Sequence, residues 1–136
     1  MLPADSKILF IHGNSTVRQV TADELGIANT QFLSVASGQE AIKLLQTEVI
    51  ALVVMNLDIG EFDCWRLTRL VRSGIYHCEK HIPIILVAKS WCERLTRITA
   101  REFGINHLLC TDDLYQLPQL VERALMGATT GLVSPR

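Results

Sequence analysis

Short apolar runs alternate along the chain with segments in which apolar residues recur every three or four positions. Runs of the first kind are typical of buried strands, and spacings of the second kind are typical of helices with one apolar face. Five runs predict strands: Ile8–Ile11, Phe32–Val35, Ala51–Asn56, Ile82–Val87 and His107–Cys110. Five spaced segments predict helices: Val17–Leu25, Ala41–Leu45, Trp65–Val71, Trp91–Phe103 and Leu117–Leu125.

The regular alternation of strand and helix indicates an α/β fold. The strands are apolar throughout, as expected for a parallel sheet that helices cover on both faces. We therefore predict a doubly wound, five-stranded parallel sheet. Ligands bind such sheets outside the carboxyl ends of the strands, so the residues that follow each strand are the candidates for a functional site.

Side chains that can cap helices stand where three of the helices are expected to begin. Asn14 or Ser15 can cap the first helix. Ser37 and Glu40 have the spacing of a capping box before the second helix. Asp63 is expected to cap the third helix.

The alternating pattern predicts one domain. Residues 1–126 carry the predicted elements, and residues 127–136, rich in Gly, Thr, Ser and Pro, are interpreted as a linker or disordered tail. A chain of 136 residues is long enough for one sizeable core. No apolar run reaches the roughly 20 residues that cross a bilayer, and no secretory signal is visible, so a cytoplasmic location is expected.

Charge and cysteine spacing argue against several kinds of function. The formal net charge of −1 gives no general attraction to nucleic acid or to an anionic membrane. The cysteines form no Cys-x-x-Cys pair, so no zinc site is predicted and reduced thiols are expected. Cys110, close to the carboxyl edge of the sheet, is the best candidate for a redox-sensitive thiol. The four cysteines are Cys64, Cys78, Cys92 and Cys110.

Several short motifs resemble, in their order and spacing, the receiver domains of response regulators in two-component signalling. They are Lys7–Ile11, Ser37–Ala41, Asp63, Ile82–Ile85 and Phe103–Ile105, and together they extend over roughly residues 7 to 125. The resemblance implies the flavodoxin-like form of the doubly wound fold. It also implies a site at the carboxyl edge, where such domains accept a phosphoryl group on an aspartate.

The positions that would accept the phosphoryl group and hold its metal depart from the family's pattern. By this resemblance, Asn56 stands in place of the acceptor aspartate, and His12 and Gly13 stand in place of the acid pair that holds Mg²⁺. An amide has no anionic oxygen with which to attack phosphorus, and Mg²⁺ prefers carboxylate oxygens. We therefore expect neither Mg²⁺ nor another cofactor.

The positions that would relay phosphorylation depart from the pattern as well. Val87 replaces a small hydroxyl residue, Thr111 replaces the lysine that contacts the phosphoryl group, and Leu108 replaces an aromatic switch residue. Without metal and lysine, little neutralises a phosphoryl group in transfer. The sequence thus indicates a degenerate pseudo-receiver without enzymatic activity, acting through protein–protein interaction independently of phosphorylation.

Other interpretations of this edge stay open. Asp58 is a possible alternative phosphate acceptor. The turn from His12 to Ser15 could hold the phosphate of a small ligand or flavin at a helix N-terminus, with Trp65 or Trp91 as a stacking partner. His12 could bind a metal or sense pH near neutrality, or it could be a structural histidine in a neutral polar cluster with Asn56 and Thr111.

An arginine stripe marks a candidate partner surface. Arg94, Arg97 and Arg101 recur at helical spacing on the predicted fourth helix. Interleaved glutamates make a solvated face with internal ion pairs the plainer explanation. Receiver domains commonly meet partners through the fourth helix, fifth strand and fifth helix, so the resemblance implies an acidic signalling partner, an output domain in the same parent chain, or a second copy. No recognition-helix motif predicts DNA binding.

Overall fold

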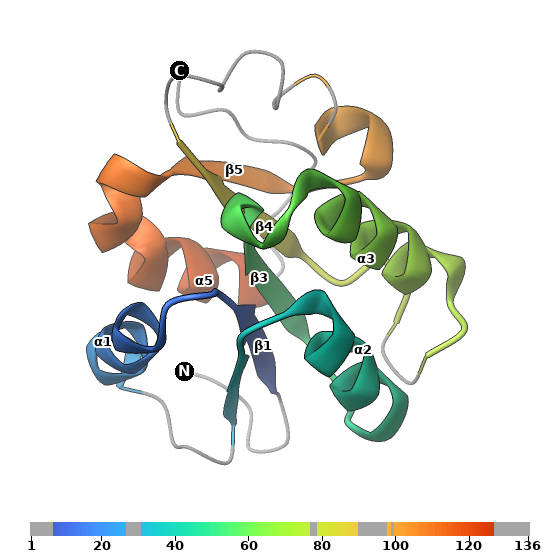
Figure 1. Cartoon of the computed structure of the whole chain (residues 1–136), viewed down its shortest axis with the longest axis horizontal. Helices are drawn as coiled ribbons and strands as arrows, with labels where there is room; N and C mark the ends of the chain where they lie inside the picture. The colour runs from blue at the N-terminus through green and yellow to red at the C-terminus, as the bar shows by residue number, and fades with distance from the viewer. Residues whose placement is uncertain (1–6, 27–30, 77–78, 90–97, 99, 127–136) are drawn as a thin grey trace.

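A computed structural model describes residues 7–26, 31–76, 79–89, 98 and 100–126. It contains one sheet of five parallel strands in the order β2-β1-β3-β4-β5, which confirms the predicted doubly wound fold (Figure 1). The strands are β1 (Ile8–Ile11), β2 (Phe32–Val35), β3 (Leu52–Asn56), β4 (Ile84–Ala88) and β5 (His107–Cys110). The helices are α1 (Ser15–Leu25), α2 (Gly38–Thr47), α3 (Glu61–Ser73) and α5 (Leu117–Leu125), with short 3₁₀ helices η1 (Leu57–Ile59) and η3 (Thr111–Gln116).

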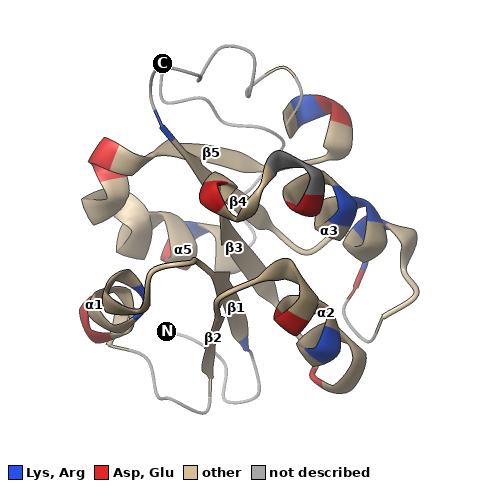
Figure 2. Cartoon of the chain, viewed as in Figure 1, with Lys and Arg blue, Asp and Glu red and all other residues tan. Residues whose placement is uncertain are grey.

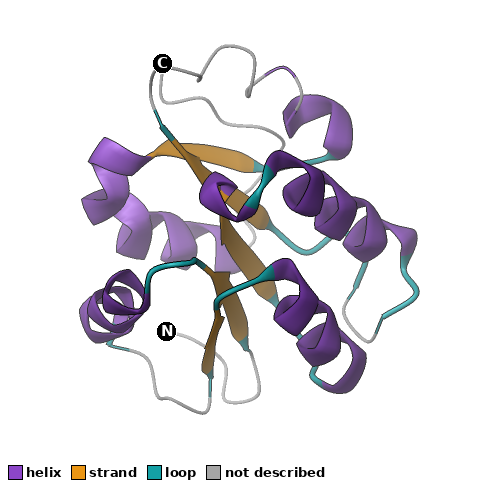
Figure 3. Ribbon diagram, in the orientation of Figure 1, coloured by secondary structure: helices purple, strands orange, loops and turns teal. Residues whose placement is uncertain are grey.

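Helices cover both faces of the sheet (Figure 3), and each face has its own apolar core. Because side chains alternate along a strand, Leu9 and Ile11 of β1 face the helices α2 and α3, whereas Ile8 and Phe10 face α1 and α5. The strand residues of β1, β3 and β4 are all buried. This double burial explains why these strands are apolar throughout rather than alternating.

The predicted start of the fourth strand needs correction. The fourth strand begins at Ile84 rather than at Ile82, because Pro83 has no N–H to donate to the ladder. Its carbonyl still accepts from the N–H of Val53 at 3.1 Å. The predicted fourth helix is helical at residues 98 and 100–103, and the rest of it lies outside the described residues. The predicted tail, residues 127–136, lies outside them too.

The predicted caps of the first two helices are confirmed. Asn14, not Ser15, caps α1, and its side-chain oxygen accepts from the N–H groups of Thr16 and Val17. Ser37 caps α2 as predicted, although Glu40 reaches back to the N–H of Ala36 instead of that of Ser37.

The prediction that Asp63 caps the third helix is wrong. Helix α3 begins at Glu61, three residues earlier than such a cap requires, and its N-cap is Gly60. Gly60 has φ 113°, a conformation that only glycine adopts readily. Asp63 instead lies beside Gly38, so that a Cβ atom added to Gly38 would be 3.4 Å from the Cβ of Asp63.

Arg72 connects three segments at the amino edge of the sheet. From the end of α3, its guanidinium donates to the carbonyls of Lys80, Ile82 and Gly104 and to the side-chain oxygen of Asn106, at 2.7–3.2 Å. The same Asn106 oxygen accepts from the N–H of Ile84 at 2.8 Å. Arg72 therefore holds α3, the start of β4 and the segment before β5 together.

Positively charged residues recur along α3 (Figure 2), and an aromatic pair lies beside them. Trp65 of α3 stacks on Phe103 with ring centroids 5.3 Å apart, and the guanidinium of Arg69 lies 5.2 Å from the centre of the Phe103 ring. Of the predicted arginine stripe, Arg101 is exposed. The other two members, Arg94 and Arg97, lie outside the described residues.

Across the described part of the chain, none of the helices combines the length and apolar character that a bilayer crossing requires.

Candidate functional site at the carboxyl edge of the sheet

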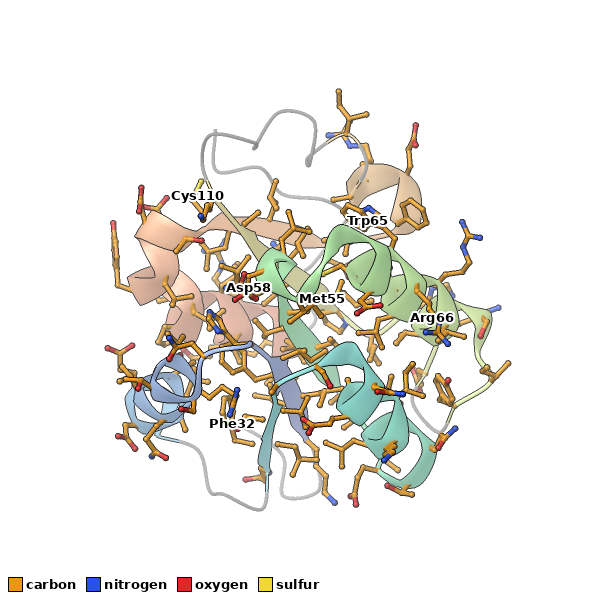
Figure 4. The ribbon with its side chains drawn as sticks, in the orientation of Figure 1. Phe32, Met55, Asp58, Trp65, Arg66 and Cys110 are labelled. Atoms are coloured by element: carbon orange, nitrogen blue, oxygen red, sulfur yellow. The ribbon has the colours of Figure 1, made fainter. Side chains whose placement is uncertain are left out.

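Parallel pairing brings the ends of the strands to one edge, as predicted. Asn56, the last residue of β3, pairs with Val87 of β4, and Ala88 pairs with Cys110 at the end of β5. His12 and Gly13 follow β1, whose last pair with β3 joins Ile11 and Met55. Figure 4 labels Asp58 beside Met55 near the end of β3, and Cys110 at the end of β5.

Asn56 is buried at this edge and closes the loop that follows it. Its side-chain oxygen accepts a hydrogen bond from the backbone N–H of Asp58 at 2.9 Å and so caps η1. The residue is 7% exposed. Its own backbone carbonyl lies 3.7 Å from the thiol of Cys64 on α3. The Asn56 side chain is therefore part of the loop's structure.

His12 is a buried histidine with one nitrogen directed at two neighbours. Its Nδ1 accepts a hydrogen bond from the backbone N–H of Asn14 at 3.1 Å. The same Nδ1 lies 3.9 Å from Oδ2 of Asp58. A nitrogen that accepts carries no proton, so the neutral ring has its proton on Nε2.

The surroundings of His12 favour this neutral ring. Burial lowers the pKa of His12 below its ordinary value of 6.5, the carboxylate of Asp58 opposes this, and the positive charge of Arg18 adds to the lowering. Arg18 also donates to the backbone carbonyl of His12 at 2.6 Å. The sequence did not predict a role for Arg18. Its only signal there is a basic residue near the start of α1, six positions after His12.

Asp58 and Gly13 lie against one another. The side chain of Asp58 is about half exposed, and its Oδ2 would be 3.5 Å from a Cβ atom added to Gly13. The carboxylate is thus turned toward His12 and the end of β1. A glycine at position 13 adds no side chain beside this carboxylate.

The remaining predicted positions are apolar or separate from this group. Val87 and Leu108 are buried in the two cores, on opposite faces of the sheet. Thr111 is exposed and begins η3. Among the described residues, no hydrogen bond joins Thr111 to His12 or Asn56. The hydrogen bonds described for the His12 and Asn56 side chains join them to backbone N–H groups of Asn14 and Asp58, and a polar cluster that includes Thr111 stays a hypothesis.

The residues at this edge lack the ligands for the Mg²⁺ ion that the resemblance to receiver domains implies. In the described ranges, no three side chains of His, Cys, Asp or Glu come close enough together to hold a metal. His12, Gly13 and Asn56 offer no carboxylate between them, and Mg²⁺ requires hard oxygen ligands. That the chain binds no Mg²⁺ remains a prediction.

The structure gives little support to a phosphate or flavin site at the turn from His12 to Ser15. The N–H groups of Thr16 and Val17, which a phosphate would use, already donate to Asn14. Trp65 is stacked on Phe103, and Trp91 lies outside the described residues.

The structure describes two of the four cysteines. Cys64 is buried on α3 and Cys110 is partly buried at the end of β5. Cys78 and Cys92 lie outside the described residues.

Comparisons with known proteins relate the chain to signalling regulators. No protein-family model matches it. The response regulator protein FleR of Pseudomonas aeruginosa is 22% identical over 126 residues, which are 93% of this chain and 26% of FleR. The probable transcriptional regulator ycf27 of Porphyridium aerugineum is 28% identical over 100 residues, 74% of this chain and 39% of that protein. The chain thus spans well under half the length of either relative.

Solved structures share the fold. The phosphorylated cyanobacterial phytochrome response regulator RcpA matches with a TM-score of 0.73 and 16% identity, covering 94% of this chain and 99% of that one. The chemotaxis protein CheY4 of Vibrio cholerae matches with a TM-score of 0.75 and 17% identity, covering 89% and 99%. At these identities the matches establish the fold, and the function has to be argued from the residues at the site.

Proposed function

We propose that this chain, for which sequence relatives and fold strongly support the response regulator receiver family, signals through protein–protein contacts without phosphorylation at Asn56. The observation that carries the proposal is the buried amide of Asn56, whose oxygen accepts the N–H of Asp58. The residue in the acceptor's place is a buried amide that caps a loop. It supplies neither a nucleophile nor a metal ligand of the required charge.

The neighbouring positions support the same conclusion. A phosphoryl group in transfer needs positive charge placed around its oxygens. At this edge Val87 is a buried apolar residue and Thr111 is an exposed neutral one. Leu108 is buried in the core and has no hydroxyl or aromatic ring to report a change at the edge. The module is accordingly proposed to have no enzymatic activity.

The proposed partners are a signalling protein or an output domain, which the parent chain itself could carry, in the cytoplasm. The proposed contact surface comprises the fourth helix, β5 and α5, with Arg94, Arg97 and Arg101. Arg101 is exposed, so its charge is available to an acidic partner or to a second copy of this chain. Neither nucleic acid nor membrane is a proposed partner of this domain alone.

Incubation with Mg²⁺ and acetyl phosphate, followed by intact mass spectrometry, tests the central claim. The wild-type chain is expected to show no added phosphoryl group. A triple variant with His12→Asp, Gly13→Asp and Asn56→Asp, which restores the acids, is the matched comparison. A stoichiometric adduct on the wild type would refute the proposal. If that adduct disappeared in Asp58→Asn, Asp58 would be the acceptor instead.

Sedimentation equilibrium tests self-association through the arginine surface. Reversal of all three charges, with Arg94→Glu, Arg97→Glu and Arg101→Glu, is expected to weaken any dimer of the wild type. Lys43→Glu is the matched control, because Lys43 is exposed on α2, away from that surface. Equal weakening by the control would show that net charge, not this surface, governs association.

A further inference from the structure

His12 and Asp58 lie at the carboxyl edge of the sheet, with Nδ1 of His12 3.9 Å from Oδ2 of Asp58. We propose that they form a proton-operated switch, in which Nδ1 of His12 exchanges the Asn14 N–H for the Asp58 carboxylate when the ring takes up a proton. The inference is independent of the proposed function, since it concerns the isolated chain and requires neither a partner nor a phosphoryl group.

The neutral state is the one in the structure. Nδ1 of His12 accepts a hydrogen bond from the N–H of Asn14 at 3.1 Å, and Oδ2 of Asp58 lies 3.9 Å from the same Nδ1. Two acceptors that face each other do not bond, so the Asp58 carboxylate makes no hydrogen bond to this nitrogen. Asp58 is instead held through its backbone N–H, which donates to Asn56.

A proton from solvent on Nδ1 reverses these relationships. The protonated ring has two donors and no acceptor. The N–H of Asn14 would then face another donor and lose its bond, while the carboxylate of Asp58 gains a charged donor. Charge-assisted bonds of this type are about 2.7–2.9 Å long, so the ring and the carboxylate need to approach by about 1 Å.

The surrounding contacts confine this movement to side chains. Arg18 donates to the backbone carbonyl of His12 at 2.6 Å, and the N–H of His12 donates to the carbonyl of Val35 at 3.1 Å. The backbone at His12 is therefore held in place, so the proposed movement is one of the ring, whose centroid lies 5.9 Å from that of the Phe10 ring, and of the Asp58 carboxylate. Gly13 adds no side chain beside that carboxylate.

The charged groups that face His12 come from two elements. Asp58, on η1, favours the protonated ring, and Arg18, on α1, opposes it. On the β2 side, the described contact of His12 is the uncharged carbonyl of Val35. Burial is the largest influence and lowers the pKa of His12, so the switch operates on the acid side of the ordinary histidine range.

The switch would change contacts in two loops, the one before α1 and the one after β3. Asn14, which loses its bond, is also the residue that caps α1. Asp58, which gains one, lies in the loop between β3 and α3. Protonation of one ring would thus alter the start of α1 and the loop after β3 together, at the same edge of the sheet.

A histidine NMR titration of the full chain tests the switch. At neutral pH, the nitrogen shifts of His12 are expected to show an unprotonated Nδ1 and a protonated Nε2. On acidification, the amide resonance of Asn14 should move with the same midpoint as His12. Asp58→Asn should lower that midpoint and Arg18→Gln should raise it. Asp112→Asn, which neutralises an exposed carboxylate on η3, is the matched control and should leave it in place.

His107 provides an internal reference, because burial and the charge of Arg123, and not Asp58, lower its pKa. Its titration should be the same in the wild type and in Asp58→Asn. Three outcomes would each overturn the switch: a neutral ring protonated on Nδ1, an Asn14 amide that does not follow His12, or an unchanged His12 midpoint in Asp58→Asn.

Discussion

The side-chain oxygen of Asn56 accepts the backbone N–H of Asp58 at 2.9 Å, across the first residue of the loop after β3. Only an oxygen acceptor on a short side chain reaches this N–H, so either asparagine or aspartate can form the bond. The contact therefore maintains the loop geometry without requiring a charge at position 56.

Replacing Asn56 with alanine removes this cap. We expect Asn56→Ala to lower the free energy of unfolding by about 1–2 kcal/mol, because a helix-type cap and a buried polar partner are lost together. Urea denaturation followed by circular dichroism measures the change. Asn56→Asp keeps the acceptor oxygen and is the control for the cap. An equal loss in Asn56→Asp, which keeps that oxygen, would contradict the cap as the source of the stability.

Arg72 is expected to be among the partly exposed positions at which a substitution lowers the free energy of unfolding most. Its guanidinium serves the carbonyls of Lys80, Ile82 and Gly104 at once. Arg72→Ala should lower the free energy of unfolding by about 2–4 kcal/mol, since bonds to a charged donor are lost and their acceptors are left without it. Urea denaturation measures this loss as well.

Arg72→Lys separates charge from shape at the same position. A lysine keeps the charge but has no planar fork with which to span several carbonyls. We expect it to recover less than half of the lost stability. Arg66→Ala, on the same helix and exposed, is the matched control and should stay within about 0.5 kcal/mol of the wild type. A large loss in that control would contradict the special role of Arg72.

The fold was predictable because its strands are buried on both faces. Runs such as Ile8–Ile11 have no polar position, and only a covered parallel sheet requires this. Boundaries were harder, because they depend on single contacts. Pro83 shortened β4, and Gly60 allowed α3 to begin at Glu61 through a backbone conformation that the apolar pattern does not record.

The candidate site was predictable as a set of positions and less so as a set of contacts. Parallel strands all end at the same edge of a sheet, so His12 and Asn56, which follow or end strands, were expected at that edge. Their partners are backbone N–H groups two residues further on, at Asn14 and Asp58. Such bonds depend on how each loop turns, which residue type alone does not determine.

The stack of Trp65 on Phe103 should contribute to holding the helical segment 100–103 on α3. Phe103→Leu keeps an apolar side chain but removes the stacked ring and the face over which Arg69 lies. We expect a loss of about 0.5–1.5 kcal/mol in the free energy of unfolding. In a Trp91→Phe background, the fluorescence of Trp65 should also shift toward that of an exposed indole. An unchanged emission would show that the stack does not shield Trp65.

Acid is expected to destabilise the fold through His107 as well as His12. Burial, and then the positive charge of Arg123, lower the pKa of His107 from 6.5. A histidine with a lowered folded pKa binds fewer protons in the folded than in the unfolded chain, so stability rises with pH between the two pKa values. The contribution is complete well above pH 6.5 and is lost as the pH falls through 6.5 toward the folded pKa.

Arg123→Gln should make this acid loss smaller. Arg123 is exposed on α5, so the substitution removes its charge without disturbing the core. With that charge gone, the pKa of His107 moves back toward its ordinary value, and the interval over which the two states differ in bound protons narrows. Urea denaturation at a series of pH values from neutral to acidic measures the slope. Arg66→Gln, which removes an equal charge from α3, should leave the slope as in the wild type. A slope that fell equally in both variants would assign the acid sensitivity to net charge rather than to His107.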